Sequence, residues 1–274
     1  MKTRSAATAT VVASAKKTAA AKKKNQTTKK PKVAIPTVTK STMSSCEDDK
    51  PWFHIFTKGD EEYNTYMANE WGFEKRGDQA LFEKISLEGA QSGLSWLTVL
   101  RKRDAYRRVF FGFDVDRVAK MTEQDVERIL NEQDAENTRN IIVRHRGKVE
   151  SVINNAKCIQ KLVLDSSNDE DEKKNNMPTH GVFDELLWTF VNDKPILNVS
   201  WKGGDGLKDA PTQTQESKDM SKKLKQLGFR FVGPTTCYAM MQSVGMVLDH
   251  PVGSKEWKEA KERLEKRKGG YQER

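Results

Sequence analysis

The stretch Gln79–Trp96 (QALFEKISLEGAQSGLSW) constrains the fold of this chain most strongly. Its first half carries large apolar residues at the spacing of one helix face, which predicts an amphipathic helix. They are Leu81, Phe82, Ile85 and Leu87. Glu88 interrupts this face, and a helix of this kind can present an acid and the aromatic Trp96 to one pocket. Burying a carboxylate is costly without a hydrogen-bond partner, and most glutamates are exposed, so spacing alone favours Glu88 in solvent at the helix end.

Four motifs stand in a fixed order along the chain. They are ANEWG (68–72), LEGAQSGLSW (87–96), VRHRGK (143–148) and FRFVGPTTCYAMMQSVGMVLDH (229–250). In order and spacing this set resembles the 3-methyladenine DNA glycosylase I family, over about residues 60 to 250. The resemblance implies an all-α, helix–hairpin–helix DNA glycosylase fold. It also implies a base-excision repair enzyme that flips 3-methyladenine out of alkylated double-stranded DNA and hydrolyses its N-glycosidic bond, without a cofactor.

The resemblance assigns the base pocket to four side chains by motif position. Glu88 would be the catalytic residue and would accept hydrogen bonds from the base, with Tyr66 as the second base-binding residue and Trp71 and Trp96 as the walls. A cationic methylated ring favours the ionised form of a nearby carboxylate and attracts aromatic faces by roughly 0.5 to 2 kcal/mol. This preference would reject undamaged adenine. The sequence shows no Asp in a hairpin context to act as general base and no Lys suited to Schiff-base chemistry, which indicates a monofunctional reaction.

Two turns carry the predicted DNA contacts. Leu94, beside the flexible Gly93, is placed to wedge into the base stack that a flipped nucleotide leaves. A basic turn before an apolar helix directs backbone N–H groups and the helix dipole toward an anion. It comprises Arg144, His145, Arg146, Gly147 and Lys148. Together with the resemblance, this turn indicates a helix–hairpin–helix that grips the DNA backbone without reading sequence, with His145 as a backbone contact or structural residue.

The chain departs from the family at the zinc site of its bacterial members, which is built from two Cys and two His. Only His250 is retained by motif position, while Met67 and Ser254 stand where a His and a Cys are expected. The N-terminal Cys position falls near Phe53 or His54. Structural zinc needs four N or S ligands, so we expect no bound metal.

The segment 51–72 is rich in aromatic residues, most of which we interpret as core. They are Trp52, Phe53, Phe56, Tyr63, Tyr66 and Trp71. We expect the first three to pack against a helix through Met240–Leu248 and to hold the chain ends together in place of zinc. The Met-rich stripe of that helix is interpreted as core.

Residues 1–48 are interpreted as a disordered basic tail, because they contain almost no large apolar residues before Val33. The net charge is +9, yet residues 1–40 hold eleven Lys or Arg and no acid, so the remaining 37 basic residues meet 39 acidic ones. The tail is typical of a nuclear localisation signal, a non-specific DNA-binding arm or an organelle transit peptide. We expect the nucleus, with the mitochondrion or plastid as the alternative.

The expected organisation is a helical glycosylase domain over 49–254, with a loop insertion at 165–180, followed by a charged helix or tail over 255–274. Helices are predicted over 96–111, 121–130 with Thr122 as N-cap, 181–191 and 217–227 with Ser217 as N-cap. A further charged helix over 255–268 is interpreted as solvent-exposed.

Three widely spaced cysteines without a CxxC pair suit a reducing compartment. No apolar run has the length of a membrane span, and we expect a monomer.

Two alternatives to the enzyme remain at this point. One is a non-catalytic DNA-binding homologue that uses the helix–hairpin–helix and the basic tail, which the missing zinc ligands favour. The other is a generic helical scaffold, which does not explain why Glu88 lies inside an apolar motif.

Overall fold

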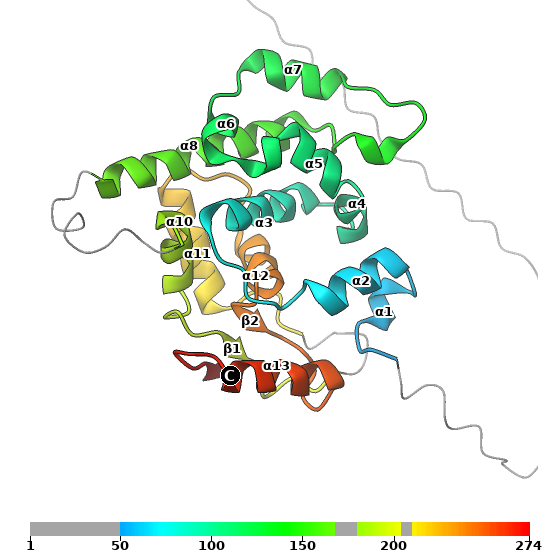
Figure 1. The fold of residues 1–274 in the computed structure, drawn as a ribbon, viewed down its shortest axis with the longest axis vertical. Helices are drawn as coiled ribbons and strands as arrows, with labels where there is room; N and C mark the ends of the chain where they lie inside the picture. The colour runs from blue at the N-terminus through cyan, green and yellow to red at the C-terminus, as the bar shows by residue number, and fades with distance from the viewer. Residues whose placement is uncertain (1–49, 168–179, 204–209) are drawn as a thin grey trace, which may run out of the picture. The chain divides into compact units, whose positions relative to one another are not determined.

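The computed structural model describes residues 50–167, 180–203 and 210–274. Within these ranges the chain is helical apart from three two-residue strands (Figure 1). The first part contains α1 (His54–Thr57), α2 (Glu61–Asn69), α3 (Asp78–Gln91), α4 (Trp96–Leu100), α5 (Arg103–Val109), η1 (Phe111–Phe113), α6 (Val115–Ala119), α7 (Glu123–Asn131) and η2 (Thr138–Asn140). The second contains α8 (Arg146–Ser167), α10 (Val182–Thr189), β1 (Ile196–Leu197), α11 (Gln215–Gln226), α12 (Pro234–Ser243), β2 (Val247–Leu248), α13 (Lys255–Glu265) and β3 (Gln272–Glu273).

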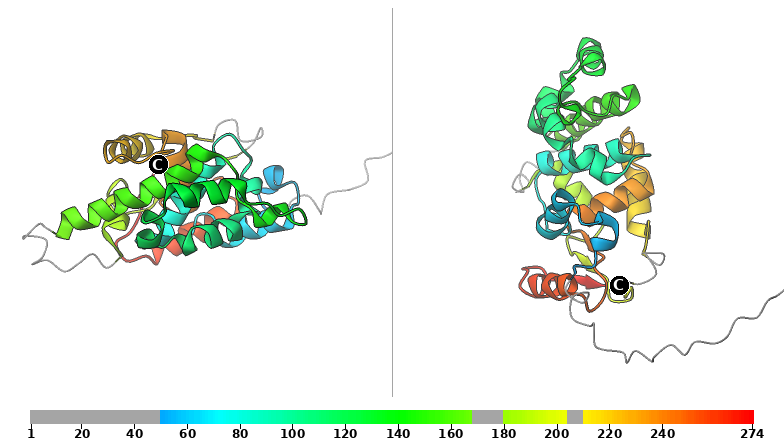
Figure 2. Two further views of the ribbon diagram at one scale, coloured as in Figure 1. Left: turned by 90° about the horizontal axis from the view of Figure 1, so that it is seen from above. Right: turned by 90° about the vertical axis from the view of Figure 1, so that its right-hand side faces the viewer.

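The predicted amphipathic helix is α3, and it lies at the centre of the core. Its large apolar residues, Leu81, Phe82, Ile85 and Leu87, are all at most 1% exposed. The helix packs against α8, α10 and α12. In Figure 1 and the right-hand view of Figure 2, α3 and α12 lie between α7 and α8 at one end and α13 at the other. A side chain of α3 is therefore enclosed by elements from both halves of the chain.

The three strands form a small parallel sheet in the order β2–β1–β3. Ile196 pairs with Val247 on one side and with Gln272 on the other. Leu197 and Leu248 pack with Ala260 and Leu264 of α13. The interpretation of 255–268 as a solvent-exposed segment is therefore wrong for those two α13 residues, which cover the sheet.

The single helix predicted over 96–111 is wrong, because the structure divides this stretch into α4, α5 and η1. The break falls at Lys102, which leaves helical geometry at φ −107° and ψ 5°. Its ammonium donates to the carbonyl of Ile141 at 2.8 Å. The turn lets Leu100 join the aromatic cluster of Phe53 while Tyr106 enters the main core, so tertiary packing overrides local helix propensity.

Helix boundaries followed their caps where the capping residue was identified. Thr122 is the N-cap of α7, as predicted, and it forms a capping box with Asp125. By contrast, α11 begins two residues before the predicted Ser217, because Thr214 is its N-cap and forms a capping box with Ser217, the third residue of the helix. The helix predicted to run through Leu248 ends at Ser243, since Gly245 at φ +75° starts the turn into β2.

The predicted tail, 1–48, lies outside the described residues, and so does most of the predicted loop 165–180. The first three residues of that loop belong to α8, which extends to Ser167. Across 50–167, 180–203 and 210–274, no helix combines the length and apolarity that a membrane crossing requires.

Candidate active site

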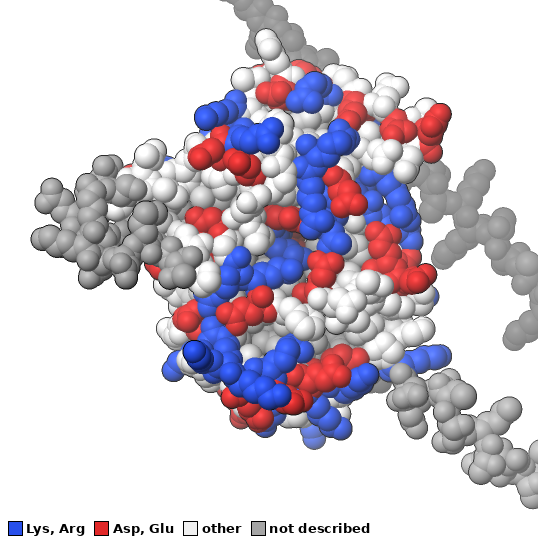
Figure 3. Space-filling view, viewed as in Figure 1, with Lys and Arg blue, Asp and Glu red and all other residues white. Residues whose placement is uncertain are grey.

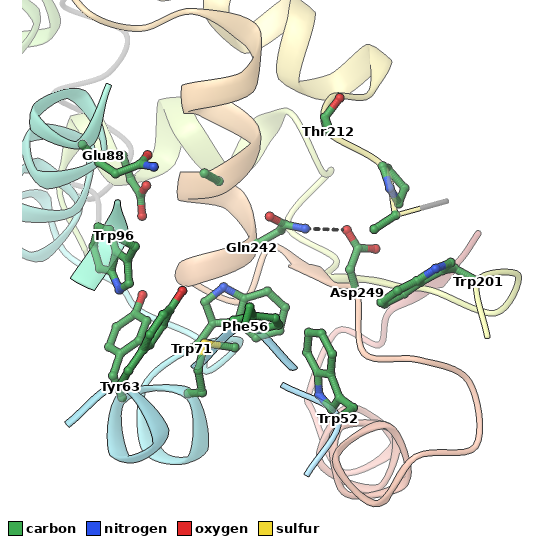
Figure 4. Close-up of a pocket in the computed structure, with 16 residues that line it drawn as sticks. Trp52, Phe56, Tyr63, Trp71, Glu88, Trp96, Trp201, Thr212, Gln242 and Asp249 are labelled. Atoms are coloured by element: carbon green, nitrogen blue, oxygen red, sulfur yellow. Dashed lines mark hydrogen bonds between the residues drawn. The ribbon is translucent and has the colours of Figure 1, made fainter. Parts of the chain in front are cut away.

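A cavity of about 410 Å³ opens between α2, α3, α4 and α12 (Figure 4). The four predicted base-binding residues, Tyr66, Trp71, Glu88 and Trp96, all line it. Its volume lies within the range of small-molecule sites. The structure thus brings Tyr66 and Trp71, from around the ANEWG motif, together with Glu88 and Trp96 of the LEGAQSGLSW motif.

Glu88 lies in the last turn of α3 and is only 5% exposed. The expectation from spacing alone, that it points to solvent, is wrong because α12 and the aromatic segment cover this side of α3. Burial raises the pKa of Glu88 to about 7, while the ammonium of Lys84 and the hydroxyl of Ser243 act in the opposite direction. With a pKa close to neutral pH, this carboxylate becomes more fully ionised beside a cationic partner.

Aromatic rings enclose the Glu88 end of the cavity. The ring centroids of Tyr66 and Trp96 are 5.2 Å apart, and those of Tyr63 and Tyr66 are 6.4 Å apart. Burial, with the nearby charge of Glu88, raises the pKa of Tyr66, so its hydroxyl keeps its proton. The indole Nε1 of Trp96 is buried without a hydrogen-bond partner among the described residues. These rings provide flat walls for a planar base.

The opposite end of the cavity holds a second carboxylate that the sequence analysis did not single out. Asp249 is 3% exposed, and burial raises its pKa. The amide of Gln242 donates to Asp249 at 2.9 Å, and the hydroxyl of Tyr238 donates to the same oxygen. In Figure 4, Gln242 lies between Glu88 and Asp249. Gln242 and Asp249 both belong to the fourth motif, at 229–250. Their place in that motif is the feature of the sequence that could have identified them as pocket residues.

His250, the position retained from the family's zinc site, lies among aromatic rings rather than among other metal-binding side chains. His250 is buried with its ring edge-on to Trp52 and Trp71, at centroid distances of 5.9 and 5.2 Å. Ser254 is occupied as the N-cap of α13. Among the described residues, no cluster of three or more His, Cys, Asp or Glu side chains is arranged to hold a metal. The donors present therefore do not fit a structural zinc.

Trp52, Phe53 and Phe56 do not pack against Met240–Leu248 as predicted, but belong to a separate cluster with Tyr66 and Leu100. Trp52 contacts Trp71, Trp201 and His250, which lie outside the Met240–Leu248 stretch. Met240, Met241 and Met246 are fully buried in the core, as expected.

The basic turn and the predicted wedge lie beside each other. Arg144, His145 and Arg146 are exposed, and Arg146 already begins α8. Lys148 is different, because its buried ammonium donates to the carbonyls of Ala90 and Ser92 at 2.8 and 2.6 Å. These bonds tie the hairpin to the end of α3.

The wedge loop begins where α3 ends. Gly93 adopts φ +76°, with open space around it. Leu94 is 37% exposed. The loop therefore presents a large apolar side chain to solvent, next to the turn at 144–146.

Basic side chains on the surface are mostly balanced by acids. On the face shown in Figure 3, Lys and Arg are interspersed with Asp and Glu. Arg103 pairs with Glu70 at 2.7 Å and Arg108 with Glu132 at 2.8 Å. The basic side chains on this face therefore do not form one large positive patch.

Comparison with known proteins identifies close relatives. A family model described as methyladenine glycosylase matches residues 56–256. The DNA-3-methyladenine glycosylase of Haemophilus influenzae is 42% identical over 188 residues, which is 69% of this chain and 88% of that protein. DNA-3-methyladenine glycosylase 1 of Escherichia coli is 42% identical over 191 residues, 70% of this chain and 89% of its own.

Solved structures agree. A crystal structure of a 3-methyladenine DNA glycosylase I has a TM-score of 0.60 at 39% identity and covers 71% of this chain and 93% of its own. The Staphylococcus aureus enzyme, solved to explain 3-methyladenine recognition, has a TM-score of 0.59 at 32% identity, with 72% and 92% covered.

Proposed function

Since the chain belongs to the methyladenine glycosylase family, we propose that it is a DNA-3-methyladenine glycosylase of base-excision repair. The resemblance drawn from the four motifs is confirmed, as is the helix–hairpin–helix glycosylase fold. The observation that carries the proposal is the carboxylate of Glu88, buried among aromatic rings at the wall of a base-sized cavity.

Glu88 acts on the base in this proposal. An adenine methylated on N3 is cationic, and its glycosidic bond is weakened because the base departs as a neutral molecule. The carboxylate accepts hydrogen bonds from the N–H groups of the base and is kept ionised by the positive ring. Tyr66 is the second polar contact, and Trp71 and Trp96 stack on the ring.

The DNA contacts fall to the loop and the hairpin. Leu94 enters the gap left by the flipped nucleotide, and Gly93 permits the loop geometry. Arg144, His145 and Arg146, with the backbone at Gly147, contact phosphates. Lys148 positions this surface through Ala90 and Ser92 rather than by touching DNA.

The reaction is monofunctional in this proposal. A lysine that attacks the sugar would have to reach the cavity, yet no lysine is among the residues that the described chain places around it. Hydrolysis leaves an abasic site.

The test is release of free 3-methyladenine from alkylated duplex DNA. Glu88→Gln should reduce the single-turnover rate by roughly 10²-fold or more, because the amide cannot carry the negative charge. Glu83→Gln is the matched control, since Glu83 lies on the same helix but pairs with Arg107 at 2.8 Å. No release by the folded wild-type protein would favour the non-catalytic DNA-binding homologue, and equal release by Glu88→Gln would remove Glu88 from the mechanism.

We also propose that the protein acts as a monomer in the nucleus. The Lys clusters of residues 22–32 support the location. A fluorescent fusion to residues 1–48 that enters the mitochondrion or plastid would contradict it.

A further inference from the structure

Lys84 is a buried lysine beside the base pocket. It lies on α3 one turn before Glu88 and is only 4% exposed. Lysine is rarely buried unless it is paired. Lys84 is not among the residues that line the cavity. Its influence on a bound base would therefore pass through Tyr66 and Trp96, which do line it.

Its ammonium contacts two pocket walls. Lys84 Nζ donates to the hydroxyl of Tyr66 at 3.4 Å. It also lies 4.8 Å from the ring centroid of Tyr66 and 5.7 Å from that of Trp96. The cation therefore lies within reach of two aromatic rings that line the cavity, without lining the cavity itself.

The hydrogen bond fixes the direction of the tyrosyl proton. An ammonium has donors and no acceptor, so the oxygen of Tyr66 must accept from Lys84. The O–H of Tyr66 is then left to donate elsewhere, toward Glu88 or toward an acceptor on a base that enters. A neutral apolar side chain at position 84 would remove this constraint.

The surrounding charges make Glu88 the main electrostatic partner of Lys84. Glu70 also attracts it, but that carboxylate is held by Arg103 at 2.7 Å. Lys75 and Arg103 are like charges that act against protonation of Lys84. Burial lowers the pKa of Lys84 to about 8, and its charge lowers the pKa of Glu88.

We propose that Lys84 is a positioning residue for base recognition, which orients the Tyr66 hydroxyl as a donor and keeps Glu88 ionised. This inference rests on the proposed glycosylase function. It explains how a carboxylate that burial alone would protonate is available as an acceptor before the cationic base arrives.

The first test is the pH dependence of kcat/KM for base release, which reports the ionisation of groups in the free enzyme. The wild type should lose activity as pH falls through about 7, because Glu88 becomes protonated, and as pH rises beyond about 8, because Lys84 loses its charge. In Lys84→Met the acid limb should move up by about one unit or more, and the alkaline limb should disappear. Lys84→Arg should keep the acid limb in place.

Lys75→Met is the matched control, because it removes a nearby charge that makes no hydrogen bond to Tyr66. An unchanged acid limb in a folded, active Lys84→Met protein would overturn the assignment to Glu88. Loss of activity without a shift of either limb would show a structural role only. Absence of release by the wild type, by contrast, would refute the glycosylase itself.

The second test is a double-mutant cycle with Tyr66→Phe at about pH 7.5, read as kcat/KM. Lys84→Met should reduce activity less in the Tyr66→Phe background than in the wild type, because the hydroxyl that it orients is already gone. Strict additivity would overturn the link to Tyr66.

Discussion

Gly245 lies where the neighbouring backbone leaves no room for a side chain. It adopts φ +75°, and an added Cβ would meet Glu74 N at 2.7 Å and Phe73 C at 2.8 Å. Gly245→Ala should lower the free energy of unfolding by about 2 to 4 kcal/mol, since strain and a backbone clash combine. Gly253→Ala, at φ +90° with open space around it, should lower it by only about 1 kcal/mol. Urea unfolding midpoints at constant slope would compare them, and equal losses would refute the clash.

The site residues differ in how far the sequence could reveal them. Motif position identified Glu88 and Trp96 as pocket residues. Helical spacing alone predicted that Glu88 would face solvent, whereas it is buried. Lys84 was missed because a lysine on an amphipathic helix is normally exposed, and its burial depends on Tyr66 and Trp96 from other elements. Asp249 was missed because its cavity exists only after α12 and β2 pack near Trp201.

At the level of elements, Lys148 joins the start of α8 to the end of α3. Its two bonds satisfy carbonyls that a helix end leaves without partners. Lys148→Met should lower the free energy of unfolding by about 2 kcal/mol, and it should slow base release further by loosening the loop that carries Leu94. Lys157→Met is the control, since Lys157 is an exposed residue of the same helix, and it should change stability by less than about 0.5 kcal/mol. Equal melting curves for the two variants would contradict this role.

Element boundaries were predictable only where local chemistry decides them. The capping box at Thr122 is encoded within four residues, and α7 begins accordingly. The break at Lys102 depends on a carbonyl 39 residues away, and the three short strands pair across more than 50 positions. No local pattern specifies such partners, so the helix over 96–111 was drawn too long and the sheet was not predicted.

At the scale of the whole molecule, the excess of basic over acidic residues is confined to the first 40 residues. Deleting residues 1–48 should weaken duplex binding and flatten its dependence on salt, because fewer counterions are released. Base release at saturating DNA should stay unchanged. Anisotropy titrations between about 50 and 200 mM salt would measure the slope. A slope equal to that of the full chain would assign DNA affinity to the body, and a body that no longer binds DNA would favour the non-catalytic alternative.

The cavity takes its walls from positions as far apart as Trp52 and Asp249. During synthesis the early segments emerge first, and domains fold as they become available. The rings of α2 and the acid of α3 therefore leave the ribosome long before Gln242 and Asp249 can enclose them. A nascent chain would hold Glu88 in water with an ordinary affinity for its proton, so the ability to select a damaged base arises only when synthesis has passed the last of these positions.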